Sequence, residues 1–178
     1  MHLIIDIGNT SAKIAVFSQG EMINVVRSSN QSLEGLDELC PQYPIKKGIW
    51  ASVISIPEEI QQQLQQLPFP MTEFTYQTPI PIRNLYKTPQ TLGVDRLAAV
   101  IAAYTLKPHH PALVIDAGTC ITYDFIDEFG QYQGGNISPG MEMRFKALHE
   151  FTSKLPKIQA SGETPPYGNS TETAIRSG

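Results

Sequence analysis

One pattern occurs twice in this chain: an apolar strand ends in an aspartate and leads directly into a turn that contains glycine and threonine. The first copy is LIIDIGNT at residues 3–10, and the second is ALVIDAGT at residues 112–119. A second apolar strand follows each turn, so each copy predicts a β-hairpin with a carboxylate at the end of its first strand. A single copy would be weak evidence, because Asp, Gly, Asn and Thr are common in ordinary turns. Two copies in corresponding places favour a functional site.

The same order of elements surrounds both copies. Each copy predicts three strands and then a helix, and the helices are expected within residues 28–39 and over residues 141–151. Prolines at 108 and 111 lie between the two repeats. We therefore predict an α/β protein with two domains, residues 1–109 and 110–178.

Further elements are expected between the repeats. Residues 48–55 are typical of a covered central strand, and a helix is predicted after Pro57, with Ile60, Leu64 and Leu67 at helical spacing. Prolines recur from residue 67 to residue 89, which predicts a strand followed by a long surface loop. An alanine-rich helix is predicted over residues 97–106, with Asp95 and Arg96 in its first turn.

Composition narrows the possible partners. The chain has 13 basic and 17 acidic residues, dispersed along its length, and a formal charge of −4. Without a basic stripe, nucleic acid is not expected as a main partner. The first apolar run is interrupted at Asp6, so neither a signal peptide nor a membrane span is expected. Cys40 and Cys120 lack metal-ligand spacing, which fits a reducing cytoplasm.

The repeated turn has the chemistry of a phosphate site. An aspartate at a strand end can hold a hydrated Mg²⁺, while glycine allows close backbone approach and threonine adds a hydroxyl group. Two such turns that face each other would hold a polyphosphate. No GxxxxGK[ST] motif is present, and no GxGxxG motif follows a strand, which disfavours a P-loop or dinucleotide-binding fold.

Four motifs carry a resemblance to a known family. They are DIGNTSAK (6–13), TPQTLGVDRLAAVIAA (88–103), VIDAGTCITYDFI (114–126) and GGNISPG (134–140), and they resemble the type III pantothenate kinases of the actin, Hsp70 and sugar-kinase superfamily. The similarity covers the whole chain, but members of the family continue beyond its last residues. The resemblance implies two ribonuclease-H-like domains with mixed five-stranded sheets flanked by helices, the second domain being incomplete. It also implies an ATP-dependent phosphorylation of pantothenate, the first step of coenzyme A synthesis, by a homodimer.

The resemblance also implies roles for single residues. The catalytic proton acceptor is Asp95, and the expected pantothenate-binding residues are Tyr86, Gly93, Val94, Asp95, Arg96 and Thr171. The expected ATP contacts are Asp6, Gly8, Asn9, Thr10, Lys13 and Thr119. The metal ligands are Asp6, for Mg²⁺, and Asp116, for a potassium or ammonium ion.

Physical chemistry supports the role of Asp95 independently. Phosphoryl transfer to an alcohol needs alignment and a late proton acceptor, and a carboxylate can serve as that acceptor. Arg96 beside it can bind a substrate carboxylate through two N–H groups. The alternative is that Asp95 is a helix-capping acid paired with a surface arginine. Lys13 is likewise either a phosphate contact or an exposed strand residue.

Two other functions remain open at this level. A non-catalytic regulator could keep the nucleotide cleft as a sensor, and another kinase or phosphatase of the superfamily could use the same turns with a different acceptor. The phosphate turns alone do not identify the acceptor.

Overall fold

The computed structural model describes residues 1–178 and divides into two compact units. Unit 1 comprises Met1–Ala112 and Ile126–Gln133, and unit 2 comprises Leu113–Phe125 and Gly134–Gly178. The predicted domains, residues 1–109 and 110–178, remain a prediction.

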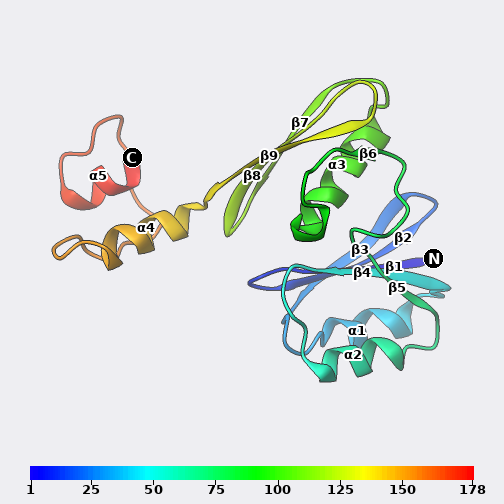
Figure 1. The fold of residues 1–178 in the computed structure, drawn as a ribbon. Helices are drawn as coiled ribbons and strands as arrows, with labels where there is room; N and C mark the ends of the chain where they lie inside the picture. Colours follow the sequence, from blue (N-terminus) through cyan, green and yellow to red (C-terminus); the bar gives the residue numbers. More distant parts are fainter. The chain divides into compact units, whose positions relative to one another are not determined.

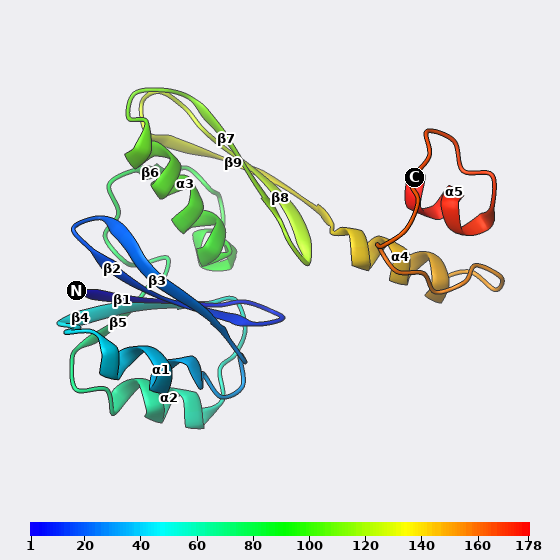
Figure 2. The same ribbon diagram turned by 180° about the vertical axis from the view of Figure 1, so that it is seen from behind.

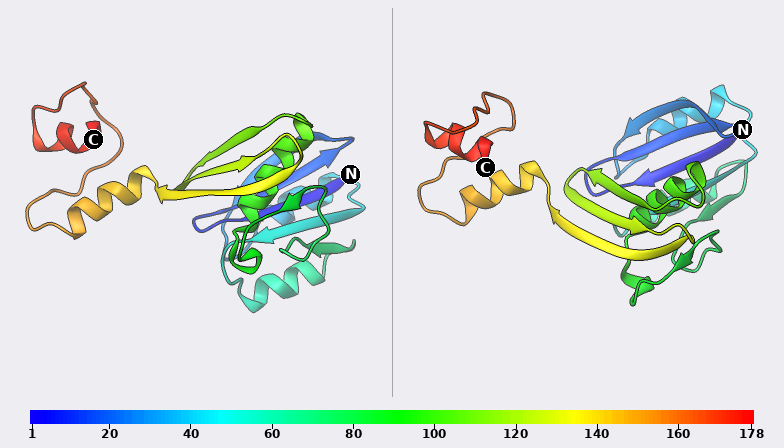
Figure 3. Two further views of the ribbon diagram at one scale, coloured as in Figure 1. Left: turned by 45° about the horizontal axis from the view of Figure 1, so that its top comes forward. Right: turned by 90° about the horizontal axis from the view of Figure 1, so that it is seen from above.

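A mixed five-stranded sheet forms the centre of unit 1 (Figure 1). Its strands follow the order β3-β2-β1-β4-β5, with bounds His2–Ile7 for β1, Ala12–Ser18 for β2, Glu21–Ser28 for β3, Lys47–Ser52 for β4 and Met71–Glu73 for β5. Strand β1 pairs antiparallel with β2 and parallel with β4. The expected mixed five-stranded sheet is therefore confirmed in this unit, and the order of its strands can be followed in Figure 3.

The core of unit 1 explains why β1 is so apolar. Leu3, Ile5 and Ile7 are at most 1% exposed and pack in one cluster with Ile60 and Leu64. These last two belong to α2 (Glu58–Gln65), which covers this face together with α1 (Gly35–Leu39). Helix α3 (Val94–Leu106) lies on the opposite face and contacts β4 (Figure 2). Because side chains alternate along a strand, Asp6 points to the face that carries α3.

The proline-rich segment and its end contain two short elements that the sequence did not indicate. After β5, residues Arg83–Asn84 form the short strand β6, and the 3₁₀ turn η2 (Pro89–Thr91) precedes α3. A further 3₁₀ turn, η1 (Cys40–Gln42), follows α1. Strand β6 pairs in parallel with β9 (Gln131–Pro139). Two residues are too short a segment to show an alternating pattern, so the predicted long loop was only partly right.

The second sheet has four strands, in the order β6-β9-β8-β7. Strands β7 (Ala112–Ala117) and β8 (Cys120–Ile126) form the second predicted hairpin. They precede β9 and α4 (Met141–Glu150), as expected for the second repeat.

The helices of unit 2 have a small core of their own. Phe145 of α4, Ile158, and Ile175 of α5 (Thr171–Ser177) form one buried cluster. Among all helices of the chain, none has the length and apolar character needed to cross a bilayer.

Candidate functional site

The first Asp-Gly-Thr turn lies where the parallel strands end. Asp6 is the second-to-last residue of β1, and Gly8, Asn9 and Thr10 lie in the connection to β2. The Gly8 N–H donates to the Ser11 carbonyl at 3.0 Å, which closes the turn. Strands β1, β4 and β5 run parallel, so the turn lies at the edge formed by their carboxyl ends. Ligands of α/β sheets bind at such edges.

Asp6 and Lys13 are brought together across the hairpin. They are direct partners in the β1–β2 register, and Lys13 Nζ lies 3.5 Å from Asp6 Oδ2. Both side chains are well exposed, Lys13 at 57% and Asp6 at 44%. An exposed carboxylate suits Mg²⁺, which usually keeps several waters and takes one or two protein carboxylates together with substrate phosphates. The neighbouring ammonium group can attract phosphate oxygens.

Asn30 supports this turn and was missed at the sequence level. Asn30 is 8% exposed, and its Nδ2 donates to the carbonyls of Gly8 at 2.9 Å and of Asn9 at 3.0 Å. Its position within the polar stretch RSSNQS is that of an ordinary loop residue, so the sequence gives no signal for its role. Through these two hydrogen bonds Asn30 supports the path of the turn.

The first turn of α3 holds the proposed acceptor residues. Gly93 is the N-cap and Val94 the first helical residue, and the half-buried Asp95 accepts a hydrogen bond at Oδ1 from the Arg96 N–H, 2.8 Å away. A Cβ atom on Gly93 would lie 2.5 Å from that Oδ1, so this conformation of Asp95 requires glycine at position 93. In Figures 1 and 2 this end of α3 lies toward the end of the sheet that carries the β1–β2 turn.

Arg96 is not a surface residue. It is 6% exposed, which contradicts the alternative of a surface arginine beside a capping acid. Its Cζ lies 5.7 Å from the ring centroid of Tyr86, within the range of a cation–π interaction. The structure thus brings two of the predicted pantothenate residues, Tyr86 and Arg96, into contact.

The second Asp-Gly-Thr turn joins β7 to β8. Asp116, Gly118 and Thr119 are exposed, and the Gly118 N–H donates to the Cys120 carbonyl at 2.9 Å. The Gly140 N–H donates to the Thr119 carbonyl at 3.0 Å. A Cβ atom on Gly140 would lie 2.2 Å from the Gly118 carbonyl oxygen, so only glycine allows this approach.

The predicted site residues fall into both units. Asp6, Lys13, Tyr86, Asp95 and Arg96 lie in unit 1, together with the rest of the first turn and the start of α3. Asp116, Thr119 and Thr171 belong to unit 2, where Thr171 is the exposed first residue of α5. A common site for both sets stays a prediction.

A cavity of about 720 Å³ lies elsewhere in unit 1. It is lined by residues of β4, β5 and α2, among them Trp50, Phe69, Met71 and Glu73. None of the predicted site residues lines it. The cavity is therefore separate from the first Asp-Gly-Thr turn.

Comparisons with known proteins show that the chain is a kinase, an enzyme of the phosphotransferase class. A family model described as Type III pantothenate kinase matches residues 2–178, and the chain belongs to that family. Two Type III pantothenate kinases match along the whole chain: that of Phocaeicola vulgatus is 64% identical, and that of Bacteroides fragilis is 55% identical. The chain spans 74% and 73% of their respective lengths.

One solved structure shows the same fold. It is that of a candidate Baf family transcriptional activator from Campylobacter jejuni, with a TM-score of 0.57 and 21% sequence identity. The match covers 98% of this chain and 71% of that chain. At this identity the likeness concerns the fold alone.

Proposed function

We propose that this protein phosphorylates pantothenate with ATP to give 4′-phosphopantothenate, the first step of coenzyme A biosynthesis. The observation that carries the proposal is membership of the type III pantothenate kinase family over residues 2–178. The 64% identity to a Type III pantothenate kinase along the full chain supports it.

The first turn is proposed to bind the phosphates of ATP. Asp6 holds the Mg²⁺ that accompanies the nucleotide, the backbone at Gly8, Asn9 and Thr10 approaches phosphate oxygens, and Lys13 adds a positive charge. The position of the turn at the carboxyl edge and the exposure of both Asp6 and Lys13 support these roles. When bound, Mg²⁺ neutralises charge on the β- and γ-phosphates.

The start of α3 is proposed to bind and activate the acceptor alcohol. Asp95 accepts the proton of the hydroxyl group late in phosphoryl transfer, and it lies in the first turn of the helix. Arg96 binds the carboxylate of pantothenate, with Tyr86 beside it. The proposed substrate contacts are completed by Gly93, Val94 and Thr171.

The second turn is proposed to complete the ATP site. Thr119 contacts the nucleotide, and Asp116 is a ligand of a potassium or ammonium ion. Their exposure in the β7–β8 turn is consistent with access for both ligands. The potassium role predicts that activity depends on K⁺ or NH₄⁺ and is not restored by Na⁺.

We also propose a homodimer that works in the cytoplasm. Both cysteines, Cys40 and Cys120, are free thiols, which fits a reducing compartment. The dimer rests on the family resemblance alone. Analytical ultracentrifugation tests it, because a dimer has twice the mass of the 19.7 kDa chain.

The proposed activity can be tested directly. The purified protein is incubated with ATP, Mg²⁺, K⁺ and pantothenate, and 4′-phosphopantothenate is measured by mass spectrometry. The expected result is product that requires both ATP and pantothenate. ATP binding with no product would contradict the proposal and favour a nucleotide sensor, while transfer to another alcohol in a substrate screen would favour a different kinase.

A further inference from the structure

A fully buried tyrosine connects the elements that carry the proposed acceptor residues. Tyr132 lies in β9, is 0% exposed and belongs to unit 1 together with α3 and β6. We infer that Tyr132 is a positioning residue for pantothenate binding, because it holds both Tyr86 and Arg96 in one arrangement. The inference deepens the proposed function and rests on it.

The hydroxyl group of Tyr132 contacts α3. Arg96 Nη2 donates a hydrogen bond to the Tyr132 hydroxyl oxygen at 3.2 Å, across 36 positions in the sequence. An arginine side chain has several rotatable bonds, so a buried contact at its end restricts the direction of the guanidinium plane. The hydroxyl group therefore helps to orient the part of Arg96 that is proposed to meet the substrate.

The ring of Tyr132 contacts Tyr86. The two rings are stacked, with centroids 6.1 Å apart and planes 9° apart. Arg96 Cζ lies 5.7 Å from the Tyr86 centroid, so the three side chains touch one another in a closed set. Displacement of one member removes support from the other two.

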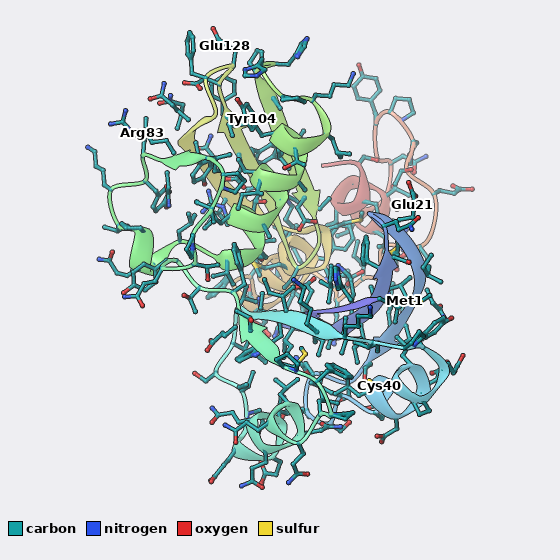
Figure 4. All side chains as sticks on the ribbon, turned by 90° about the vertical axis from the view of Figure 1, so that its right-hand side faces the viewer. Met1, Glu21, Cys40, Arg83, Tyr104 and Glu128 are labelled. Carbon is teal, nitrogen blue, oxygen red and sulfur yellow. The ribbon has the colours of Figure 1, made fainter.

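The backbone of Tyr132 fixes the segment that carries Tyr86. Asn84 of β6 is its register partner, and the Leu85 N–H donates to the Tyr132 carbonyl at 3.1 Å. The Asn84 Oδ1 then accepts from the Tyr86 N–H at 2.9 Å. These hydrogen bonds explain the role of β6, a strand of only two residues: it places Tyr86 against Tyr132. Figure 4 labels Arg83 on β6 and Tyr104 on α3, the two elements that Tyr132 connects.

The hydroxyl group can be removed without loss of the ring. In Tyr132→Phe the stacking on Tyr86 and the pairing with β6 remain, while Arg96 loses one hydrogen bond, the one to the Tyr132 hydroxyl group. Without this hydrogen bond Arg96 is held less firmly in the orientation that binds the substrate. Because a hydrogen bond to a charged group contributes more free energy than a neutral one, we expect the KM for pantothenate to rise about tenfold. The KM for ATP should stay within about twofold of the wild type, because the ATP phosphates are assigned to other residues.

A matched control removes a hydroxyl group elsewhere in unit 1. Tyr43 accepts a hydrogen bond from Asn24 Nδ2 at 3.2 Å and packs, half-buried, against the core of unit 1, so Tyr43→Phe also deletes one hydroxyl contact. This variant should keep both KM values. Thermal unfolding of both variants shows whether they fold.

Steady-state kinetics of the full chain give the decisive comparison. A tenfold rise in the KM for pantothenate in Tyr132→Phe alone supports the inference. An unchanged KM with a lowered melting temperature would overturn it and leave Tyr132 with a purely structural role. If the wild type forms no product, the proposed function fails, and calorimetric titration with pantothenate tests the inference instead. Equal binding by wild type and Tyr132→Phe, or binding by neither, would then overturn it.

Discussion

The two Asp-Gly-Thr turns have similar sequences and different supports. In the strand before the first turn, Leu3, Ile5 and Ile7 are at most 1% exposed, whereas Leu113 and Ile115 before the second turn are 61% and 57% exposed. The first turn is held by the side chain of Asn30, and the second by a backbone hydrogen bond from Gly140. A local motif thus specifies the hairpin, while contacts from distant residues decide how firmly each turn is held.

The largest effect on stability is expected at the second turn. In Gly140→Ala the new methyl group would meet the carbonyl oxygens of Gly118 and Thr119 at 2.2 and 2.5 Å, and backbone atoms cannot move aside cheaply. We expect a loss of about 3 kcal/mol in the free energy of unfolding and a raised KM for ATP. Chemical denaturation and kinetics measure these quantities.

Gly118→Ala is the matched control for stability at this turn. Its Cβ atom would have Cys120 O as its nearest neighbour, at 3.9 Å. This variant should be nearly as stable as the wild type. Equal stability of Gly140→Ala and Gly118→Ala would mean that the second turn is not held by close contact with Gly140.

At the first turn the corresponding support is a side chain. Asn30→Ala leaves the Gly8 and Asn9 carbonyls without a buried donor, which should cost about 2 kcal/mol and lower the melting temperature by roughly 4–8 °C. The KM for ATP should rise, because the turn loses its fixed path. Asn24→Ala, which removes a contact with Tyr43, serves as the control. A normal KM for ATP in Asn30→Ala would show that the turn keeps its shape unaided.

Replacement of Lys13 is expected to change the KM for ATP with little change in the free energy of unfolding. Its ion pair with Asp6 is exposed, so Lys13→Ala should change the free energy of unfolding by less than about 1 kcal/mol. If Lys13 binds phosphate, the KM for ATP rises about tenfold, as expected for loss of a charged contact. Lys47→Ala is the control, because Lys47 is exposed and pairs with His2 at the opposite end of strand β1. Equal KM values for the two variants would leave Lys13 as an exposed strand residue.

The smallest effect concerns the segment that carries Asn30. Hydrogen bonds from the Ser32 hydroxyl and from the Ser29 N–H, at 3.1 Å for the latter, lower the pKa of Glu34 from 4.5 to about 2. Because the folded-state pKa is lowered, this stabilisation is present above pH 4.5 and is lost as the pH falls toward 2. Glu34→Gln should therefore flatten the acid limb of the stability curve, measured by denaturation at several pH values. An identical limb in wild type and variant would contradict this.

Much of the fold could be predicted because it follows from local patterns. Helix α3 was expected at residues 97–106 with Asp95 in its first turn, and it spans Val94–Leu106. Ile60 and Leu64 were expected on one face of a helix, and both are buried there. Apolar periodicity specifies such elements without knowledge of distant contacts.

The rest depends on contacts between residues far apart in the chain. Asn30 reaches the first turn from 21 and 22 positions away, and Tyr132 reaches Arg96 from 36 positions away. Neither residue stands out in the sequence, since one lies in a polar loop and the other in an ordinary strand. For the same reason the burial of Arg96 could not be predicted from its place at the start of a helix.

Asp95 is proposed to accept the proton of the acceptor alcohol, and the variant Asp95→Asn tests this role. The matched control is Asp37→Asn, which changes an exposed aspartate in the first turn of α1. We expect kcat for pantothenate phosphorylation to fall by about 10²–10⁴ in Asp95→Asn, with ATP binding retained, and to stay normal in Asp37→Asn. A kcat for Asp95→Asn within a few-fold of the wild type would contradict it.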